Sequence, residues 1–494
     1  MRGIWTTAQV RAAEQRLMRR VPEGSLMRRA AFGVATEAAR LLIERTGGVF
    51  GRRVALLVGS GDNGGDALWA GTFLRRRGAA VTAVLLNPER AHAAGLAALR
   101  RAGGRVTTDG KTVLPAADLV IDGIVGLSAH GPLRPAAAEL VALVTAPIVA
   151  VDLPSGVEPD TGAVNGPAVR ATVTMTPGAL KPGHVLAAGA AYSGRVVLID
   201  IGLGAELPEP DLVQLDAADV GRAWPTPGPT DDKYTQGVPG IAAGSARFPG
   251  AAALAAGGAV LAKSGMVRFA GTAADLVRSR WPEVIATGTV EDAGRVQSWV
   301  IGPGFGTGNA SREALAYVLG QGVPLCVDAD AITMLAEHPE LWDARDPDTP
   351  IVLTPHDGEF ARLAGEVGED RVAAARRAAK RFNVVLLLKG TTTVVAAPDG
   401  RALVNPARSA WPATAGSGDV LSGMLGALLA AGLDPWFAAG AAAYAHGLAA
   451  DLGAAGAPVP SAGIAEAIPA AVRALRAAAG SLPAHGTNQP KQRL

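Results

Sequence analysis

The stretch Val54-Ala55-Leu56-Leu57-Val58-Gly59-Ser60-Gly61-Asp62-Asn63-Gly64 joins a short apolar run to a glycine-rich loop. An unbroken apolar run of this length is typical of a strand buried on both faces, as strands of parallel sheets are. Glycines let the chain turn sharply after such a strand, and a helical segment follows them. This stretch therefore predicts a strand, a turn and a helix, with the loop at the carboxyl edge of a parallel sheet.

Similar apolar runs recur along the first half and alternate with Ala-rich helical segments, at 81–86, 119–121, 148–151, 171–175 and 196–199. Such alternation predicts a parallel sheet with helices on both faces. A polar, Pro-rich stretch at 224–232 interrupts the pattern, which restarts at 298–301, 324–327, 351–354, 384–388 and 393–396. We therefore expect two α/β domains at 1–218 and 233–480, a linker at 219–232 and a disordered tail at 481–494.

Composition narrows the classes of protein. At 494 residues and 49% hydrophobic, the chain is long enough for two or three domains with sizeable cores. A net charge of +2 offers no large basic surface, so we expect no nucleic-acid partner. The single cysteine, Cys326, excludes disulfides within the chain and lies in an apolar run, which predicts a buried thiol. No apolar stretch is typical of a membrane span or signal peptide, so we expect a cytoplasmic protein with no membrane partner.

The first glycine loop matches G-x-G-x-x-G, the pattern of dinucleotide-binding sites. Two observations argue against that use. The next strand ends in Asn87-Pro88 without an acidic residue for a ribose, and Asp62 and Asp66 place carboxylates where a pyrophosphate would lie. The loop is better suited to a cation or to a neutral sugar and base.

Oxygen-bearing side chains follow the next strands. Asp122 ends one apolar run, and Asp152 and Ser155 follow another. Because parallel strands end at the same edge of a sheet, Asn63, Asp122 and Ser155 could supply hard oxygen ligands for one cation. In the alternative interpretation, Asp122 and Asp152 only cap the turns that follow them.

A second glycine turn, Ala415-Gly416-Ser417-Gly418-Asp419-Val420-Leu421-Ser422-Gly423, joins small residues to one carboxylate at a predicted helix start. Backbone N–H groups from Gly416 to Gly418 would face a transferring phosphoryl group. Asp419 would take the proton of an attacking alcohol. The same residue types are favoured helix caps, which is the alternative interpretation.

Three further polar residues have two interpretations each. Lys389 and the glycine and threonines after it suit nucleotide phosphates, or Lys389 is a solvated lysine at a strand end. His356 contacts a substrate or belongs to a turn, and Glu359 contacts a ligand or caps the next helix.

Four motifs of the first half occur together in the order of one known family. They are Gly61-Asp62-Asn63-Gly64-Gly65-Asp66, the segment 122–126, Asp152-Leu153-Pro154-Ser155-Gly156 and Leu180-Lys181-Pro182-Gly183-His184. About the first 215 residues resemble the NAD(P)HX epimerase family, also called the YjeF N-terminal domain. The resemblance implies a Rossmann-like three-layer α/β/α sandwich that interconverts the R and S epimers of hydrated NADH or NADPH.

The resemblance also implies roles for individual residues. Asp152 is the acid/base group, and Asn63, Asp122 and Ser155 bind a potassium ion. Three residues depart from those usual in the family: Asp62, Ala67 and Ser128. The resemblance implies that Ser128 lies in a loop over the substrate. Substrate contacts are implied for Asn63, Gly64, Gly65, Asp66, Gly126, Leu127, Ser128, Ala129, His130, Gly131, Pro132 and Asp152.

The second half resembles the ADP/ATP-dependent NAD(P)HX dehydratase family, a ribokinase-like α/β fold, over about residues 230–475. The motifs are 302–306, 328–331, 354–360, 388–393 and the second glycine turn. The resemblance implies that Ala251, Gly304, His356 and Asp419 contact the hydrated nucleotide. It implies nucleotide binding, with magnesium, by Lys389, Gly390, Thr391, Thr392, Thr393 and Gly418.

Both resemblances imply one substrate, hydrated NADH or NADPH, and therefore a bifunctional repair enzyme. Asp419 would activate the C6 hydroxyl for attack on ADP or ATP, and phosphate would then leave to restore the dihydronicotinamide ring. The alternative function is a ribokinase-like kinase of a small alcohol, such as a vitamin precursor, with a nucleotide-binding, non-catalytic N-terminal regulatory domain. We also expect a homo-oligomer.

Overall fold

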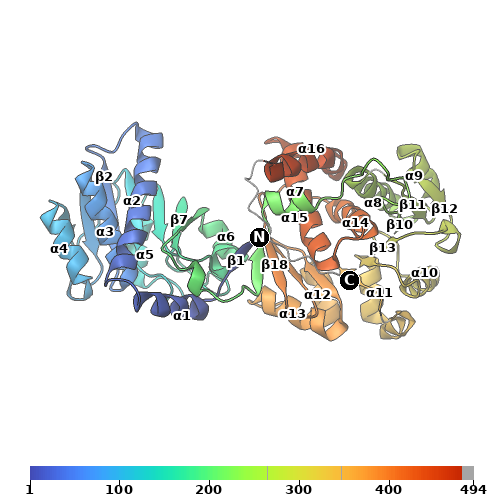
Figure 1. Ribbon diagram of the computed structural model, residues 1–494, viewed down its shortest axis with the longest axis horizontal. Coiled ribbons are helices and arrows are strands. Elements are labelled where there is room, and N and C mark those ends of the chain that lie inside the picture. Colours follow the sequence, from blue (N-terminus) through green and yellow to red (C-terminus); the bar gives the residue numbers. More distant parts are fainter. Residues whose placement is uncertain (129, 264, 347, 481–494) are drawn as a thin grey trace. The chain divides into compact units, whose positions relative to one another are not determined.

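The computed structural model describes residues 1–128, 130–263, 265–346 and 348–480. Over these residues the chain forms two compact units, whose elements are labelled in Figure 1. The N-terminal unit runs from Gly3 to Leu212, and the C-terminal unit contains Met1–Arg2 and the chain from Val213 onward. β1 (Arg2–Ile4) and β9 (Leu212–Gln214) contain the points where the chain passes between the units. The tail expected at 481–494 lies outside the described residues.

The N-terminal unit is built on a sheet in the order β4-β3-β2-β5-β6-β7-β8, in which all neighbouring strands are parallel. The strand order reverses between β2 and β5, and in open α/β sheets ligands bind at such a reversal, beyond the carboxyl ends of the strands. The strands are β2 (Arg53–Val58), β3 (Ala80–Leu85), β4 (Arg105–Thr107), β5 (Leu119–Gly123), β6 (Ile148–Val151), β7 (Val173–Pro177) and β8 (Arg195–Ile199).

Helices cover both faces of this sheet, which confirms the predicted three layers. Helices α2 (Ser25–Thr46), α3 (Asp62–Arg76) and α4 (Ala93–Arg101) share one buried core with one face (Figure 1). The opposite face packs against α5 (Pro135–Ala142). Two further helices are α1 (Thr7–Met18) and α6 (Ala187–Tyr192).

The sheet of the C-terminal unit contains the order β18-β17-β16-β15-β14-β13-β10-β11-β12. Strands from β10 to β16 pair in parallel, whereas β16, β17 and β18 are mutually antiparallel. The strands are β10 (Pro239–Ala242), β11 (Arg268–Ala270), β12 (Ile285–Thr287), β13 (Ser298–Ile301), β14 (Leu325–Val327), β15 (Ile351–Leu353), β16 (Val385–Leu388), β17 (Thr392–Ala396) and β18 (Ala402–Pro406). The predicted second α/β domain is thus confirmed.

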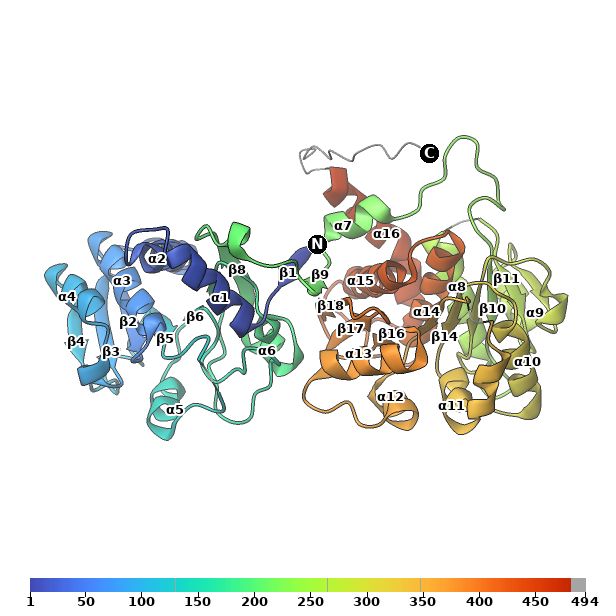
Figure 2. The ribbon, with the colours of Figure 1, turned by 60° about the horizontal axis from the view of Figure 1, so that its bottom comes forward.

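The helices of this unit also form two layers, which Figure 2 shows above and below the sheet. One layer shares the large buried core with Cys326 and consists of α7 (Ala217–Ala223), α8 (Pro249–Ala262), α9 (Ala274–Arg280), α14 (Ser417–Ala430), α15 (Pro435–Ala454) and α16 (Ser461–Gly480). The other layer consists of α10 (Asn309–Leu319), α11 (Asp330–Glu337), α12 (Asp357–Ala364) and α13 (Arg371–Phe382). None of the helices in the described parts of the chain is long and apolar enough to cross a membrane.

Helices α8 and α14 cross in backbone contact through glycines. A Cβ atom on Gly258 would lie 2.3 Å from the Val420 carbonyl oxygen, and one on Gly423 would lie 2.0 Å from that of Ala255. Only glycine fits at either position, because a methyl group would overlap fixed backbone atoms. The contact fixes the N-terminal half of α14, which carries the second glycine turn.

The boundary between the units differs from the expected linker at 219–232. Residues from Val213 onward already belong to the C-terminal unit, and α7 occupies the start of that linker. Gly221 lies against the Leu475 backbone of α16, and Trp224 is buried and donates its indole N–H to the Ala262 carbonyl. The Pro-rich composition concealed a helix held by packing, so 219–224 is structured and the domain boundary moves from 218 to 212.

Candidate active sites

The N-terminal unit contains a cavity of about 1380 Å³ at the carboxyl ends of β2, β5 and β6, the strand reversal noted above. The walls include residues of the first glycine loop and of the loop 126–132, both predicted from the sequence to contact substrate. Gly64 and Gly65 are instead buried in the first turn of α3, where Gly64 packs against the Gly59 backbone. Ala129 lies outside the described residues. The predicted residues that line the cavity are Asn63, Asp66, Gly126, Leu127, Ser128, His130, Gly131, Pro132 and Asp152.

The structure brings Asn63, Asp122 and Ser155 to one edge of the sheet. Ser155 donates its amide and its hydroxyl to the buried Asp122 carboxylate, at 2.9 and 2.8 Å. Asn63 Nδ2 donates to the Val151 carbonyl at 2.8 Å, which leaves the Asn63 amide oxygen for another partner. The set presents an amide oxygen from the start of α3, a carboxylate from the end of β5 and a hydroxyl from the loop after β6.

Asp122 is the group that would favour a cation there. Asp122 is fully buried, and burial raises the pKa of its carboxyl group from 3.8 to about 6. The hydrogen bonds from Ser155 and Ile124 lower this pKa but do not outweigh burial. Those partners are neutral donors, so they only partly offset the cost of burying a negative charge. A monovalent cation bound by oxygen atoms would offset the rest, and the residues present fit the predicted potassium ion.

Asp152, the predicted acid/base residue, forms a buried ion pair. Its Oδ1 lies 2.5 Å from Lys181 Nζ, and the two side chains are 7% and 1% exposed. Lys181 also donates to the Thr176 hydroxyl at 2.8 Å. The backbone of Asp152 has φ +68°, a conformation that costs a residue with a side chain free energy and that often occurs at functional sites.

His184 holds this strained residue in place. Its Nδ1 accepts from the Lys181 amide at 3.0 Å, so its Nε2 donates to the Asp152 carbonyl at 2.6 Å. Burial, followed by the charge of Lys181, lowers the pKa of His184 to about 4, and the ring stays neutral at physiological pH. The sequence motif 180–184 therefore orients Asp152, a role that the spacing of its residues did not reveal.

Two further carboxyl groups line the same cavity. Burial, followed by the charges of Asp152, Asp62 and Glu14, raises the pKa of Asp66 well above 3.8. Burial also raises the pKa of Glu14, on α1, above 4.5 despite the nearby charge of Lys181. Glu14 could not be predicted from the sequence, because a single carboxylate on an amphipathic helix carries no signal of its own.

Ser128, which departs from the family pattern, has a structural partner. Arg11 donates from one nitrogen to the Leu127 carbonyl at 2.7 Å and to the Ser128 hydroxyl at 3.1 Å. Arg11 therefore ties the predicted substrate loop to α1.

In the C-terminal unit, the predicted site residues lie on loops after β13, β15 and β16 and at the N-termini of α8 and α14. A Cβ on Gly304 would lie 2.8 Å from that of Ala251, so these two predicted substrate contacts are neighbours. Gly302, just before them, has φ +121°, and its Cα packs against the Asp328 backbone. Glycine is needed at both positions for the backbones to approach this closely.

The second glycine turn begins helix α14, as predicted. Gly416 is its N-cap with φ +83°, and the Ser417 amide donates to the Thr414 carbonyl at 3.2 Å. That amide is thus already used, and an anion would rely on the next amides of the first turn, Gly418 and Asp419. The buried Ser417 hydroxyl lies 3.0 Å from His446 Nε2, a contact that fixes the turn.

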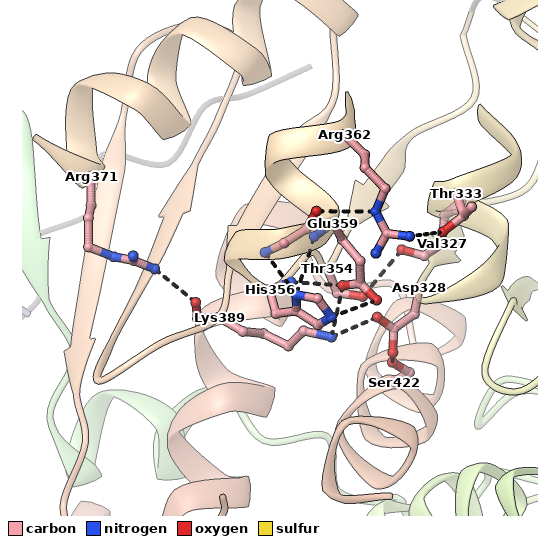
Figure 3. A network of polar contacts seen from close by, with 11 residues as sticks. Val327, Asp328, Thr333, Thr354, His356, Glu359, Arg362, Arg371, Lys389 and Ser422 are labelled. Atoms are coloured by element: carbon pink, nitrogen blue, oxygen red, sulfur yellow. Dashed lines mark hydrogen bonds and ion pairs between the residues drawn. The ribbon is translucent and has the colours of Figure 1, made fainter. Parts of the chain in front are cut away.

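Lys389 lies at the centre of a charged network (Figure 3). Its Nζ is 2.8 Å from Asp328 Oδ1 and 3.8 Å from Glu359 Oε2, and the other oxygen of Asp328 accepts from the Ser422 hydroxyl at 2.7 Å. Burial lowers the pKa of Lys389, but the two carboxylates outweigh it, so the net direction is upward and the ammonium stays charged. A Cβ on Gly418 would lie 3.6 Å from this ammonium group, which places Lys389 beside the second glycine turn.

Asp419 is poised to exchange a proton near neutral pH. Burial, followed by the charge of Asp328, raises its pKa from 3.8 to about 7, against the opposing charge of Lys389. A general base is most effective when its pKa lies near the operating pH. Asp419 was predicted from the sequence, but no role was predicted for Asp328, whose charge acts on it from the loop after β14, or for Ser422, which donates to Asp328.

His356 has a structural role in addition to its predicted contact. It is the N-cap of α12, and its Nδ1 accepts from the amides of Gly358 and Glu359 at 3.0 and 3.2 Å. The other ring nitrogen, Nε2, lies 3.4 Å from Oε1 of Glu359, so both ring nitrogens face groups at the start of α12. Glu359 completes the capping box by accepting from the His356 amide at 2.8 Å, as the capping interpretation predicted.

The segment 389–393 contains the turn 389–391 between the antiparallel strands β16 and β17 and the first two residues of β17. Thr391 is exposed, Thr393 is half-buried and Thr392 is buried, so the threonines are not equally accessible. Arg371 donates to the Lys389 carbonyl at 2.8 Å, bonds Asp357 at 2.9 Å and packs on Gly390. Arg371, on α13, therefore shapes the predicted nucleotide loop, and no sequence motif indicated it.

Comparison with known proteins gives a match for each unit. Residues 23–183 match the family model described as YjeF-related protein N-terminus, and residues 240–469 match the one described as NAD(P)H-hydrate dehydratase. A bifunctional NAD(P)H-hydrate repair enzyme of Mycobacterium tuberculosis is 58% identical over 437 residues, which cover 88% of this chain and 90% of that protein. Its counterpart from Mycobacterium leprae is 56% identical over 459 residues, or 92% and 95% of the two chains.

Among solved structures, one similar chain is the ADP/ATP-dependent NAD(P)H-hydrate dehydratase from Bacillus subtilis, co-crystallised with ATP and Mg²⁺. It is 28% identical, with a TM-score of 0.48, and the match covers 53% of this chain and 98% of that one.

Proposed function

The chain belongs to the family of bifunctional NAD(P)H-hydrate repair enzymes, and from this membership we propose how its two units divide the reaction. The N-terminal unit interconverts the R and S epimers of hydrated NADH and NADPH. The C-terminal unit dehydrates the S epimer at the expense of ADP or ATP, through a phosphorylated intermediate. Both epimers are then returned to the usable cofactor.

The observation that carries this proposal is the arrangement around Asp419. Its pKa of about 7 suits a base for an alcohol, and the amides of Gly418 and Asp419 and the Lys389 ammonium provide positive charge beside it. A group that accepts a proton next to donors for a phosphoryl group is what transfer from a nucleotide to a hydroxyl requires.

In the proposed dehydration, Asp419 takes the proton of the ring hydroxyl, whose oxygen attacks the terminal phosphorus of the nucleotide. The first-turn amides of α14 stabilise the charge that develops on the phosphoryl oxygens. Lys389 leaves Asp328 and binds the nucleotide phosphates, and His356 contacts the substrate. Magnesium, which enters with ADP or ATP, neutralises phosphate charge when bound. Phosphate then leaves as the ring nitrogen lone pair forms the double bond, and loss of a proton from C5 completes the elimination.

In the proposed epimerisation, Asp152 is the acid/base group, and its ion pair with Lys181 holds it in place. Asn63, Asp122 and Ser155 hold potassium, which supplies positive charge beside Asp122 when bound. Loops 63–66 and 126–132 enclose the nucleotide. A cytoplasmic location and a homo-oligomer are part of the proposal, and light scattering during gel filtration measures the oligomeric state.

A single assay tests the division of labour. The full chain is mixed with both epimers of hydrated NADH and with ADP, then with ATP, while NADH absorbance and phosphate release are recorded. Asp419→Asn is expected to abolish NADH recovery, because no base activates the hydroxyl. Asp152→Asn should leave fast use of the S epimer and slow the R epimer to its spontaneous rate.

Three outcomes would count against the proposal. No NADH recovery with either nucleotide would exclude repair. A phosphate ester that accumulates without NADH would indicate the alternative kinase. Equal loss of both kinetic phases in Asp152→Asn would contradict the assignment of epimerisation to the N-terminal unit.

A further inference from the structure

Asp66 is a buried carboxyl group to which the mechanism above gives only a contact with substrate. It is 8% exposed, it lies in the N-terminal part of α3 and it lines the large cavity. Its Oδ1 atom is buried and has no hydrogen-bond partner within the described part of the chain. Since a buried polar atom without a partner costs free energy, this oxygen is suited to a ligand that enters the cavity.

Acidic side chains face Asp66 from several elements. Burial is the largest influence on its pKa, and Asp152 after β6, Asp62 on α3 and Glu14 on α1 add to it in the same direction. Burial and these charges all raise the pKa of Asp66 above 3.8, which favours the protonated form of this carboxyl group.

The basic side chains that line the cavity are Arg11, Arg28, Arg90, His92, His130 and Arg134. Lys181 and His92, which lie against Asp152 and Gly65, contact other groups. Lys181 forms its 2.5 Å ion pair with Asp152. His92, which packs against Gly65, accepts from the Gly95 amide through Nδ1. The site thus contains one buried carboxyl group whose surroundings favour its protonated form and one that is paired with an ammonium group, the combination that acid and base catalysis requires.

We propose that Asp66 is the general acid of the epimerisation and that Asp152 is the general base at the opposite face of the ring. This role rests on the function proposed above and adds a second catalytic residue to it. Asp66 gives its proton to the hydroxyl on C6, the C6–O bond breaks and water leaves. The ring nitrogen lone pair forms a C6=N double bond, so the carbon becomes planar.

A second water molecule then attacks C6 from the other face. Asp152 takes a proton from this water as the new C–O bond forms, and the electrons of the C6=N bond return to nitrogen. The product is the other epimer, and no oxidant or reductant is needed. Asp152 finally returns the proton to Asp66 through solvent, and the reverse reaction uses the two groups in exchanged roles.

The experiment uses the full chain without ADP or ATP, so that only epimerisation runs. One purified epimer of hydrated NADPH is the probe, and chromatography separates it from its product. Asp66→Asn is expected to slow epimerisation by about 100-fold or more, because the amide cannot transfer a proton. The same substitution removes a buried group whose ionisation costs free energy, so the thermal midpoint of the variant should not fall. The dehydratase rate of the variant with the S epimer should be unchanged.

A matched control is Asp62→Asn, which changes an exposed carboxylate on the same helix. This variant should keep the rate of epimerisation within about threefold of that of the unchanged protein. The rate should fall at high pH as Asp66 loses its proton, and in Asp62→Asn this fall should occur at a lower pH, since the charge of Asp62 raises the pKa of Asp66. In Asp66→Asn that loss of rate at high pH should disappear altogether. A merely structural role for Asp66 would lower the rate without changing the pH profile.

Water labelled with ¹⁸O provides the second measurement. Each catalysed inversion should place one labelled oxygen on C6, because the attacking water differs from the one that left. Normal epimerisation by Asp66→Asn, or inversion of the unchanged protein without label, would overturn the proposal. No epimerisation by the unchanged protein would instead refute the function assigned to the N-terminal unit.

Discussion

The pKa of Asp419 leads to a prediction about Asp328. Burial first, and the Asp328 charge second, hold this pKa at about 7. At pH 6, only about one tenth of a group with that pKa is ionised, so the second-order rate constant kcat/KM should be about tenfold below its plateau. Dehydration should therefore become faster as pH rises through about 7.

The substitution Asp328→Asn removes that negative charge and also releases Lys389, whose positive charge lowers the pKa of Asp419. Both changes lower the pKa of Asp419. A decrease of about one unit, or about 1.4 kcal/mol, would leave about half of Asp419 ionised at pH 6. The profile of the variant at pH 6 should therefore reach about half of its own plateau.

The assay measures NADH recovery from the S epimer at limiting substrate, with saturating magnesium and ADP, between about pH 6 and pH 9. Because the substitution Asp328→Asn would also change how Lys389 is held, the position of the inflection is compared, and not the height of the plateau. Ser422→Ala is the control, since it removes a hydrogen bond to Asp328 but no charge. An inflection that stays at the original pH in Asp328→Asn, or that moves upward, would refute the electrostatic account.

Three other perturbations have expected outcomes. Lys181→Met leaves the Asp152 carboxylate buried without its partner, so urea denaturation of the N-terminal unit should show a loss of about 3–5 kcal/mol, and epimerisation should cease. Potassium should raise the thermal midpoint more at about pH 8 than at about pH 5. The reason is that the folded-state pKa of Asp122 is raised to about 6, and only the ionised carboxylate attracts the cation. An equal effect of potassium at both pH values would exclude Asp122 as a ligand. Gly423→Ala should destabilise the C-terminal unit by about 1–3 kcal/mol, whereas Gly447→Ala, where a Cβ meets nothing within 4 Å, should not.

The sequence was most informative where chemistry and periodicity coincided. The apolar runs became the central strands β2, β5 and β6, and the polar residues that follow them line one cavity, as parallel strands require. Short or polar strands gave no such signal. β4 (Arg105–Thr107) lies at a sheet edge, and β10 (Pro239–Ala242) contains proline and glycine, which are unfavourable in strands.

The partners of the site residues could not be predicted, because pairing across the fold depends on packing. Lys181 was part of a motif, but its ion pair with Asp152 joins residues 29 positions apart. Asp328 lies 61 positions from Lys389 and 94 from Ser422. Burial, which sets the pKa of Asp66 and Asp419, is likewise a property of the folded chain and not of a local pattern.

The ion pair between Lys389 and Asp328 has a consequence for turnover under the proposed mechanism. In the free protein the ammonium group already has a partner, so a nucleotide that binds Lys389 would have to displace Asp328 before its phosphates gain that charge. This exchange would offset part of the binding free energy, so the used nucleotide and phosphate would be held less tightly than by an unpaired lysine. When they left, Asp328 would pair with the lysine again, which would favour release of the products.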